Sequence, residues 1–97
     1  MLTGKQKTYL RGLAHNLQPI IQIGKGGITE NLLKTVADAL EAKELVKISV
    51  LQNCMEDPKA LGPQIASAVE GELVQTIGRT LVFYKESLKK KEIELPK

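Results

Sequence analysis

Hydrophobic positions along the chain follow two spacings in turn, one typical of helices and one typical of strands. From Thr3 to about Asn16, apolar residues recur three and four positions apart, which predicts a helix with one buried stripe. Pro19 prevents this helix from continuing, and the β-branched residues of Pro19–Ile23 predict a first strand. The predicted buried stripe of the helix consists of Leu10, Leu13, Ala14 and Leu17.

The two spacings alternate again in the middle of the chain. The segment Thr29–Glu44 has a helical spacing, and its first residue is a suitable N-cap. Leu45–Leu51 alternates apolar and polar residues, which predicts a strand with one buried face. A turn then leads to a third helix, which begins at Pro58 or Pro63 and ends near Glu70, since proline is best tolerated in the first turn.

The last part of the chain predicts a hairpin and a tail. The strands Leu73–Ile77 and Thr80–Lys85 are joined by Gly78-Arg79, a two-residue connection that suits a type II′ turn. Residues 86–97 are charged, and we expect them to form a mobile tail.

Together these elements predict an α/β domain with the order αβαβαββ over residues 1–85, followed by the charged tail over 86–97. We expect two layers, one of helices and one four-stranded mixed sheet. The first two strands should pair parallel, with the second helix as their connection, and the last two should pair antiparallel.

Length and composition agree with one small domain. The chain has 97 residues, of which 42% are hydrophobic, enough for a two-layer core. The lone Cys54 has no partner for an internal disulfide, which fits a reducing cytoplasm. No apolar run approaches the ~18 residues of a membrane span. We therefore expect a cytoplasmic monomer that does not bind a membrane.

The charges are sorted along the chain, although the net charge is only +3. Residues 1–27 carry a charge of +4 and no acidic residue, residues 28–75 carry −4, and residues 76–97 carry +3. If the fold brings the two basic ends together, they form a cationic face that suits a polyanion. The alternative is an ordinary spread of surface lysines.

A glycine-rich loop stands between the first strand and the second helix. It consists of Gly24-Lys25-Gly26-Gly27. Such a loop lets backbone N–H groups approach an anion at the positive end of the following helix, with a lysine beside it. The loop therefore predicts a phosphate site. The alternative is a tight turn that needs positive φ and binds nothing.

Other basic residues are candidates for the same polyanion. Lys7, Arg11 and His15 recur every fourth residue and form a second stripe on the first helix, or else a merely solvated helix face. Arg79 in the hairpin turn either reaches a phosphate or keeps the turn soluble. The three aromatic residues of the chain are too few for a base-stacking platform, which favours recognition of backbone and shape over reading of bases if the polyanion is a nucleic acid.

Enzymatic function finds little support in these residues. The glycine loop lacks the G-x-x-x-x-G-K-[ST] order of a nucleotide-binding loop, and no Ser or Thr directly follows Lys25. With one histidine and one cysteine, the chain offers no convincing metal site or nucleophile–base pair. We expect a non-catalytic protein with no metal, cofactor or small-molecule substrate.

Several motifs in order resemble the YhbY-like proteins, small bacterial proteins made of a single CRM domain. Residues 2–7 (LTGKQK), 13–15 (LAH), 23–28 (IGKGGI) and 73–79 (LVQTIGR) carry the resemblance, which covers about residues 2–85. It implies an RNA-binding domain related in shape to the C-terminal domain of bacterial initiation factor three. It likens the glycine loop to the GXXG loop of KH domains, which clamps nucleotide backbone.

The resemblance also implies a partner for the basic residues described above. For single-domain bacterial members, it implies association with precursors of the large ribosomal subunit and their ribosomal RNA. The expected contacts, besides the four loop residues, are Lys5, Lys7, Arg11, His15, Arg79 and Lys85. Two departures stand out: Lys85 replaces an expected arginine and so loses its planar fork, and Gly62-Pro63 interrupts a helix.

Two other classes of function stay open at this point. A protein-interaction module could present the basic face to an acidic partner protein. DNA binding is the third hypothesis, although the sequence lacks a helix-turn-helix pattern and a dimerising zipper. The leading hypothesis is an RNA-binding protein that docks its glycine loop and basic first helix on structured RNA.

Overall fold

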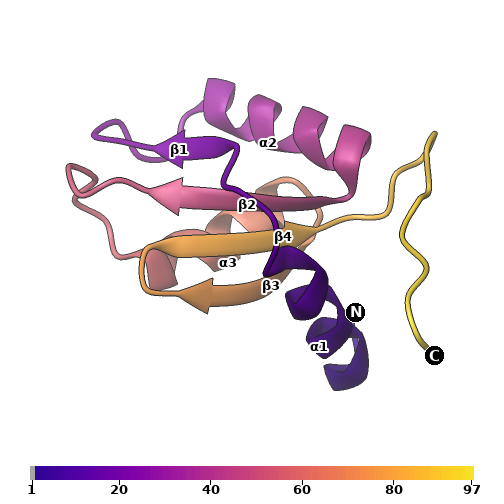
Figure 1. Ribbon diagram of the computed structural model, residues 1–97. Coiled ribbons are helices and arrows are strands. Elements are labelled where there is room, and N and C mark those ends of the chain that lie inside the picture. The colour runs from indigo at the N-terminus through magenta and orange to yellow at the C-terminus, as the bar shows by residue number, and fades with distance from the viewer. Residues whose placement is uncertain (1) are drawn as a thin grey trace.

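The computed structural model describes residues 2–97, which form three helices and four strands in the predicted order αβαβαββ (Figure 1). The ends of the elements agree with the predictions within two residues. The elements are α1 (Gly4–Ala14), β1 (Ile21–Ile23), α2 (Glu30–Lys43), β2 (Leu45–Val50), α3 (Pro58–Ala68), β3 (Glu72–Ile77) and β4 (Thr80–Tyr84).

The four strands form one mixed sheet with the order β1-β2-β4-β3. The parallel pairing of β1 with β2 and the antiparallel pairing of β3 with β4 confirm the predictions. β4 also pairs antiparallel with β2 and therefore lies between β2 and β3. Gly78 has a φ of +54°, in agreement with the predicted hairpin turn. The glycine loop, the loop after β2 and this hairpin all lie at one end of the sheet, on the left in Figure 1.

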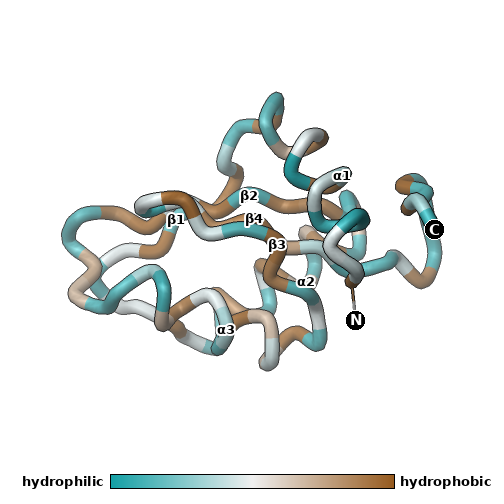
Figure 2. Tube along the Cα trace, turned by 90° about the horizontal axis from the view of Figure 1, so that it is seen from below, coloured by the Kyte–Doolittle hydropathy of each residue, from teal (hydrophilic) through white to brown (hydrophobic). Residues whose placement is uncertain are grey.

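Helices cover both faces of the sheet, so the domain has three layers instead of the expected two. α2 and α3 lie on one face, and α1 lies on the other (Figure 2). The strands show why: in β4, Leu81 and Phe83 point into the larger core, whereas Val82 and Tyr84 point into a second cluster under α1. The expectation that β2 buries only one face is wrong for the same reason, since Leu45 joins the α1 cluster.

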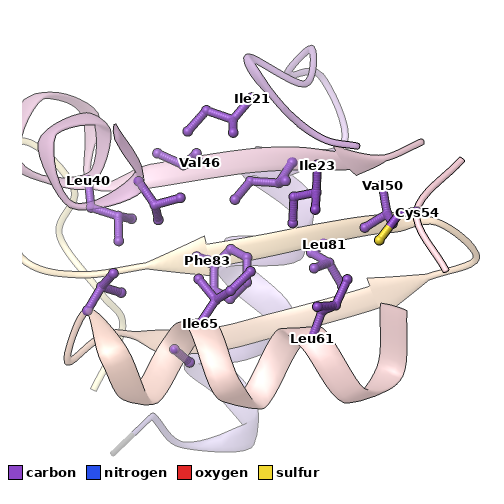
Figure 3. Close-up of a cluster of buried hydrophobic side chains, with 14 residues drawn as sticks. Ile21, Ile23, Leu40, Val46, Val50, Cys54, Leu61, Ile65, Leu81 and Phe83 are labelled. Carbon is purple, nitrogen blue, oxygen red and sulfur yellow. The ribbon is translucent and has the colours of Figure 1, made fainter. Parts of the chain in front are cut away.

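The larger core lies between the sheet and the pair α2 and α3. Figure 3 shows Leu61 and Ile65 of α3 directed toward Leu81 and Phe83 of the sheet. Phe83 is fully buried at the centre of this layer. Cys54 is also buried here as a free thiol, as a small hydrophobic residue would be.

The apolar stripe of α1 is only half as buried as predicted. Leu10 and Ala14 are 0% and 1% exposed and rest on the sheet, whereas Leu13 and Leu17 are 38% and 37% exposed. A single short helix on a sheet touches it along one line, here the two residues that lie one turn apart. Leu13 and Leu17 instead border a shallow groove beside Leu45.

Local hydrogen bonds explain where the first two helices begin. The Thr3 hydroxyl accepts a bond from the Gln6 N–H at 3.1 Å, and the Gln6 side chain accepts one from the Thr3 N–H at 3.0 Å. This reciprocal pair is a capping box. Thr29 caps α2 as predicted, because its hydroxyl accepts a bond from the Leu32 N–H at 3.0 Å.

α3 begins at Pro58, the earlier of the two predicted starts, and continues through Gly62 and Pro63. Asp57 caps it, and its side chain accepts a bond from the Lys59 N–H at 3.0 Å. The glycine is explained by packing, because a Cβ at Gly62 would lie 2.8 Å from a methyl group of Leu73. α3 therefore approaches β3 more closely at this point than any larger residue would permit.

The C-terminal segment is attached to the domain, and the expectation of a mobile tail is wrong. The Glu41 carboxylate accepts bonds from the Ser87 hydroxyl at 2.6 Å and from the N–H groups of Leu88 and Lys89 at 3.0 and 3.1 Å. The hydrogen bond from Ser87 and those from Leu88 and Lys89 lower the pKa of the Glu41 carboxyl below its ordinary value of 4.5. The sequence offered no local sign of them, because more than 45 positions separate the partners.

Glu44 holds the next part of the tail. Its carboxylate, which is 1% exposed, accepts backbone bonds from Ser87, Glu92 and Ile93 at 2.8, 2.7 and 2.7 Å. Burial by itself raises the pKa of Glu44, but these donors and the nearby charge of Lys91 outweigh it and hold the pKa below 4.5. The carboxylate is therefore ionised and fully bonded inside the fold.

The tail also reaches α1. Ile93 and Leu95 pack against the cluster that α1 forms with the sheet. The Gln6 amide donates a bond to the carbonyl of Pro96 at 3.0 Å, while its oxygen completes the capping box. The tail thus connects the C-terminal end of α2 to the N-terminal turn of α1.

Candidate nucleic-acid interface

The glycine loop forms a closed turn directly after β1. The Gly27 N–H donates to the Gly24 carbonyl at 3.0 Å, so Lys25 and Gly26 occupy the tip of the turn. The side chain of Lys25 is exposed there. α2 begins three residues beyond the turn, after its Thr29 cap. The predicted order of strand, glycine turn and helix is therefore present.

The backbone conformation requires only one of the three glycines. Gly27 has a φ of +63°, and a Cβ there would lie 2.5 Å from a carboxylate oxygen of Glu56. Gly24 and Gly26 do not have positive φ, and a Cβ at either would make ordinary contacts at 3.6 and 3.9 Å. The reading of this loop as a turn that needs positive φ thus applies to Gly27 alone. Gly24 and Gly26 leave bare backbone on either side of Lys25.

Glu56 gives the loop two unequal sides. Its carboxylate lies beside Gly27, although the two residues are far apart in sequence. A phosphate on that side would meet a like charge, whereas the side of Gly24 and Lys25 has no carboxylate this close among the glycine contacts. The structure therefore favours anion approach at the Lys25 tip. Sequence reasoning missed Glu56 because no local pattern links it to the loop.

Arg79 holds the loop that lies next to the glycine turn. Its Nε donates to the Val50 carbonyl at 2.9 Å, and its Nη2 donates to the carbonyls of Leu51 and Cys54 at 2.6 and 3.3 Å. The Leu51 N–H in turn donates to the Ile23 carbonyl at 2.8 Å, where the glycine turn starts. The sequence predicts that Arg79 contacts a phosphate or keeps the turn soluble, and neither prediction includes these bonds to backbone carbonyls. Here it positions the loops.

Lys85 lies at the other end of the sheet. Its Nζ donates to the Val69 carbonyl at 3.0 Å, beyond the last residue of α3. Because β4 runs the length of the sheet from the hairpin to Lys85, the structure does not bring this lysine together with the glycine loop (Figure 1). Its contact with RNA remains a prediction, and its observed contact is a helix cap.

The basic stripe of α1 is present on the surface. Arg11 and His15 are exposed and Lys7 is half-buried, one turn apart on the same side of the helix. Lys5 is exposed but lies two positions from Lys7, which places it about 200° around the helix. Within residues 2–97, the one ion pair is Lys91 with Glu86 at 3.3 Å, so the stripe has no carboxylate partner there.

A small groove lies between the stripe and the sheet, with a volume of about 200 Å³. α1 supplies one wall, and β2, β3 and β4 supply the floor and the other wall. Lys47 on this floor donates to the carbonyls of Ala14 and Leu17, both at 3.3 Å, and so caps α1. The lining residues are Arg11, Ala14, His15, Lys47, Gln75, Ile77, Thr80 and Val82.

Sequence reasoning found only Arg11 and His15 of this groove. Lys47, Gln75 and Thr80 come from three different strands and meet only because β4 inserts between β2 and β3. The one available signal was polar residues within strand segments, such as Lys47 between two buried residues. The alternation predicts a strand with one buried face, which leaves Lys47 on the other face, and the structure covers part of that face with α1.

The described residues also limit the chemistry. Among residues 2–97 there is no cluster of three or more His, Cys, Asp or Glu side chains able to hold a metal ion. In the same part of the chain, every helix is too short or too polar to cross a membrane. Tyr84 is buried in the α1 cluster, and burial raises the pKa of its hydroxyl, so it is not free to stack on a base.

The chain resembles known proteins over its whole described length. The family model of the CRS1 / YhbY (CRM) domain matches residues 2–85. The probable RNA-binding protein YqeI of Bacillus subtilis (strain 168) is 56% identical over 96 residues, which cover 99% of this chain and 100% of YqeI. An RNA-binding protein of Haemophilus influenzae is 38% identical over 96 residues, covering 99% of this chain and 96% of that protein.

A solved structure agrees with the fold. The solution structure of the hypothetical protein SAV1595 from Staphylococcus aureus has a TM-score of 0.83 and 58% sequence identity. The match covers 99% of this chain and 100% of that one. The arrangement of three helices and a four-stranded mixed sheet is therefore shared with an experimentally determined relative.

Proposed function

The chain belongs to the CRS1 / YhbY (CRM) domain family, and from this premise we propose that it is a non-catalytic protein that binds ribosomal RNA in precursors of the large ribosomal subunit. The glycine turn and the basic stripe of α1 make the contacts. The protein acts as a cytoplasmic monomer.

The tip of the glycine turn is the observation that carries this proposal. Gly24 and Gly26 flank an exposed lysine, and neither glycine is required by packing or by positive φ. The absence of a side chain at these two positions allows the sugar–phosphate backbone of RNA to approach the protein backbone closely. The N-terminal end of α2, just beyond the turn, adds a favourable dipole for a phosphate.

The basic stripe supplies further attraction. Lys7, Arg11 and His15 lie on one side of α1, without an ion-pair partner among residues 2–97. Cations that neutralise phosphates release bound counterions, so the affinity for RNA should fall as the salt concentration rises. The slope of that decrease reports how many phosphates are contacted.

The test is the affinity of the protein and two charge-reversed variants for a large-subunit ribosomal RNA fragment. Lys25→Glu should weaken binding about tenfold or more and lower the salt slope by about one phosphate. The matched control is Lys43→Glu, which changes another exposed lysine at the far end of α2. Equal affinity of Lys25→Glu and wild type, with both variants folded, overturns the role of the loop.

The ribosomal partner is tested separately in cell extract. On a sucrose gradient, the protein should migrate with large-subunit precursors and return to the top after ribonuclease treatment or at moderate salt. If it stays at the top under all conditions, the ribosomal assignment fails even where RNA binding in vitro succeeds.

A protein-interaction module is the second candidate, and one observation favours it. Leu13, Leu17 and Ile20 expose apolar surface, with Ile20 51% exposed, and they line neighbouring grooves that share Lys43. An acidic, partly apolar partner protein would suit this surface. Capture of one partner that resists ribonuclease and is lost in Lys43→Glu would favour this function over RNA binding.

A further inference from the structure

We propose that the groove between the C-terminal turn of α1 and the sheet binds one unpaired ribonucleotide. The inference rests on the proposed function and deepens it: it adds a subsite that reads a base, at a place separate from the glycine turn. The groove is about 200 Å³ in volume, smaller than the roughly 300–1,000 Å³ of sites for drug-sized ligands, and so has room for the base of one nucleotide, with the sugar and phosphate at its open side.

The lining residues supply what a nucleotide needs. Arg11 and His15 stand on the α1 wall, where they can reach a phosphate, and the planar guanidinium of Arg11 can also lie against a base. Gln75 and Thr80 on the sheet provide an amide and a hydroxyl, which can pair with the edge of a base or with a 2′-hydroxyl. Ala14 on the α1 wall and Val82 on the sheet supply apolar surface.

The polar groups of the groove are available for a ligand. Among the polar side chains of the groove, that of Lys47 is hydrogen-bonded within residues 2–97, since its Nζ caps α1. Ile77 at the rim is 61% exposed and provides an apolar surface for a base. A groove that combines free polar groups with an exposed apolar rim fits an aromatic, hydrogen-bonding ligand.

The sheet connects this groove to the glycine turn. Register places Gln22 beside Ser49, Ser49 beside Thr80, and Thr80 beside Ile77, in one row across all four strands. Gln22, Ser49 and Thr80 are only partly buried or exposed, and the row runs from the strand that leads into the glycine turn. Its span is three strand spacings, about 14 Å, a distance that a short unpaired stretch of the same RNA can follow.

The experiment compares two RNA hairpins that differ by one bulged nucleotide. Wild-type protein should bind the bulged hairpin several-fold more tightly than the fully paired one. Thr80→Val keeps the shape of the side chain and removes the hydroxyl, and Gln75→Leu removes the amide, so each should abolish this preference and leave affinity for the paired hairpin unchanged. Thr35→Val on α2, whose hydroxyl donates to the Asn31 carbonyl at 2.8 Å, is the matched control.

A second measurement uses free nucleotides. Titration with each of the four ribonucleoside monophosphates, followed by NMR, should shift the amide signals of residues 75–80 and 11–15 and not those of α2. Equal binding of the two hairpins by wild type, or loss of affinity for both hairpins in Thr80→Val, overturns the subsite. If the affinity for both hairpins depends on Lys25 but not on Thr80 or Gln75, the proposed function stands and the subsite fails. If the protein binds neither hairpin, the proposed function and the subsite are both refuted.

Discussion

The carboxylate of Glu44 accepts a hydrogen bond from the backbone N–H of Ile93 at 2.7 Å, across 49 positions of sequence. The same oxygen accepts a bond from Glu92, and the other oxygen accepts one from Ser87. Glu44 is 1% exposed, so no bulk water replaces these donors. The last residue before β2 is therefore both the end of α2 and the anchor of the tail.

Glu44→Gln should loosen the tail and destabilise the domain. The amide keeps the shape of the side chain but removes the charge, and it points a donor at one of the N–H groups. We expect the free energy of unfolding to fall by about 1–3 kcal/mol, measured by urea denaturation. Glu70→Gln is the control, because Glu70 also has positive φ but is exposed. Equal losses in the two variants would contradict the anchoring role.

Acid should release the tail before the rest of the domain unfolds. Glu41 and Glu44 both have folded-state pKa values lowered below 4.5. Their contribution to stability is therefore fully present above the unfolded value and is lost as the pH falls through the folded value. The protection of residues 87–93 against amide exchange, relative to the intrinsic rate at each pH, should fall as the pH drops below 4.5. The same loss of protection in Glu44→Gln as in wild type would assign the transition to other groups.

The Arg79→Lys variant tests whether Arg79 holds the neighbouring loops in place or binds a phosphate. Lysine keeps the charge but lacks the planar fork that reaches three carbonyls. We expect a loss of about 1–3 kcal/mol in stability and faster amide exchange at residues 51–54. Arg11→Lys on the exposed helix face should leave stability within about 0.5 kcal/mol of wild type. If Arg79→Lys weakens RNA binding without changing stability or exchange, the arginine contacts RNA directly.

Alanine substitutions in the glycine turn should show which glycine is needed for stability and which for RNA affinity. Gly27→Ala forces a side chain into positive φ and should cost about 1–2 kcal/mol of stability. Gly26→Ala makes only an ordinary contact with the Thr29 methyl group and should change stability by no more than about 0.5 kcal/mol. It should nevertheless weaken RNA binding, measured by fluorescence anisotropy, because the added methyl group meets the RNA backbone. Unchanged affinity in Gly26→Ala would remove the reason for glycine there.

Periodicity was enough to predict the elements, because caps and apolar spacing are local. Thr29 and the hairpin glycine were found in this way, and both are confirmed. The third layer was not predicted, because the alternation of β2 indicates one buried face. The continuous apolar run Leu81–Tyr84 of β4 was the available sign, since such a run is typical of a strand covered on both faces. The tail was missed for a related reason: its anchors, Glu41 and Glu44, look like ordinary surface glutamates on an amphipathic helix.

The candidate site was predicted in part. The glycine turn and the α1 stripe are visible in sequence because each is a short contiguous pattern. The positions of Arg79, Lys85 and Glu56 are not, because their partners are backbone carbonyls or a glycine far along the chain. Lys47, Gln75 and Thr80 come together only through the strand order of the sheet.

The bond between Gln6 and Pro96 brings the first and last turns of the chain to the same side of the domain. Chains whose ends meet can be closed into a ring or spliced into a surface loop of another polypeptide with little distortion. A short linker from residue 97 back to residue 2 should therefore be accepted by this fold. The domain could therefore be inserted into a larger protein as one folded unit.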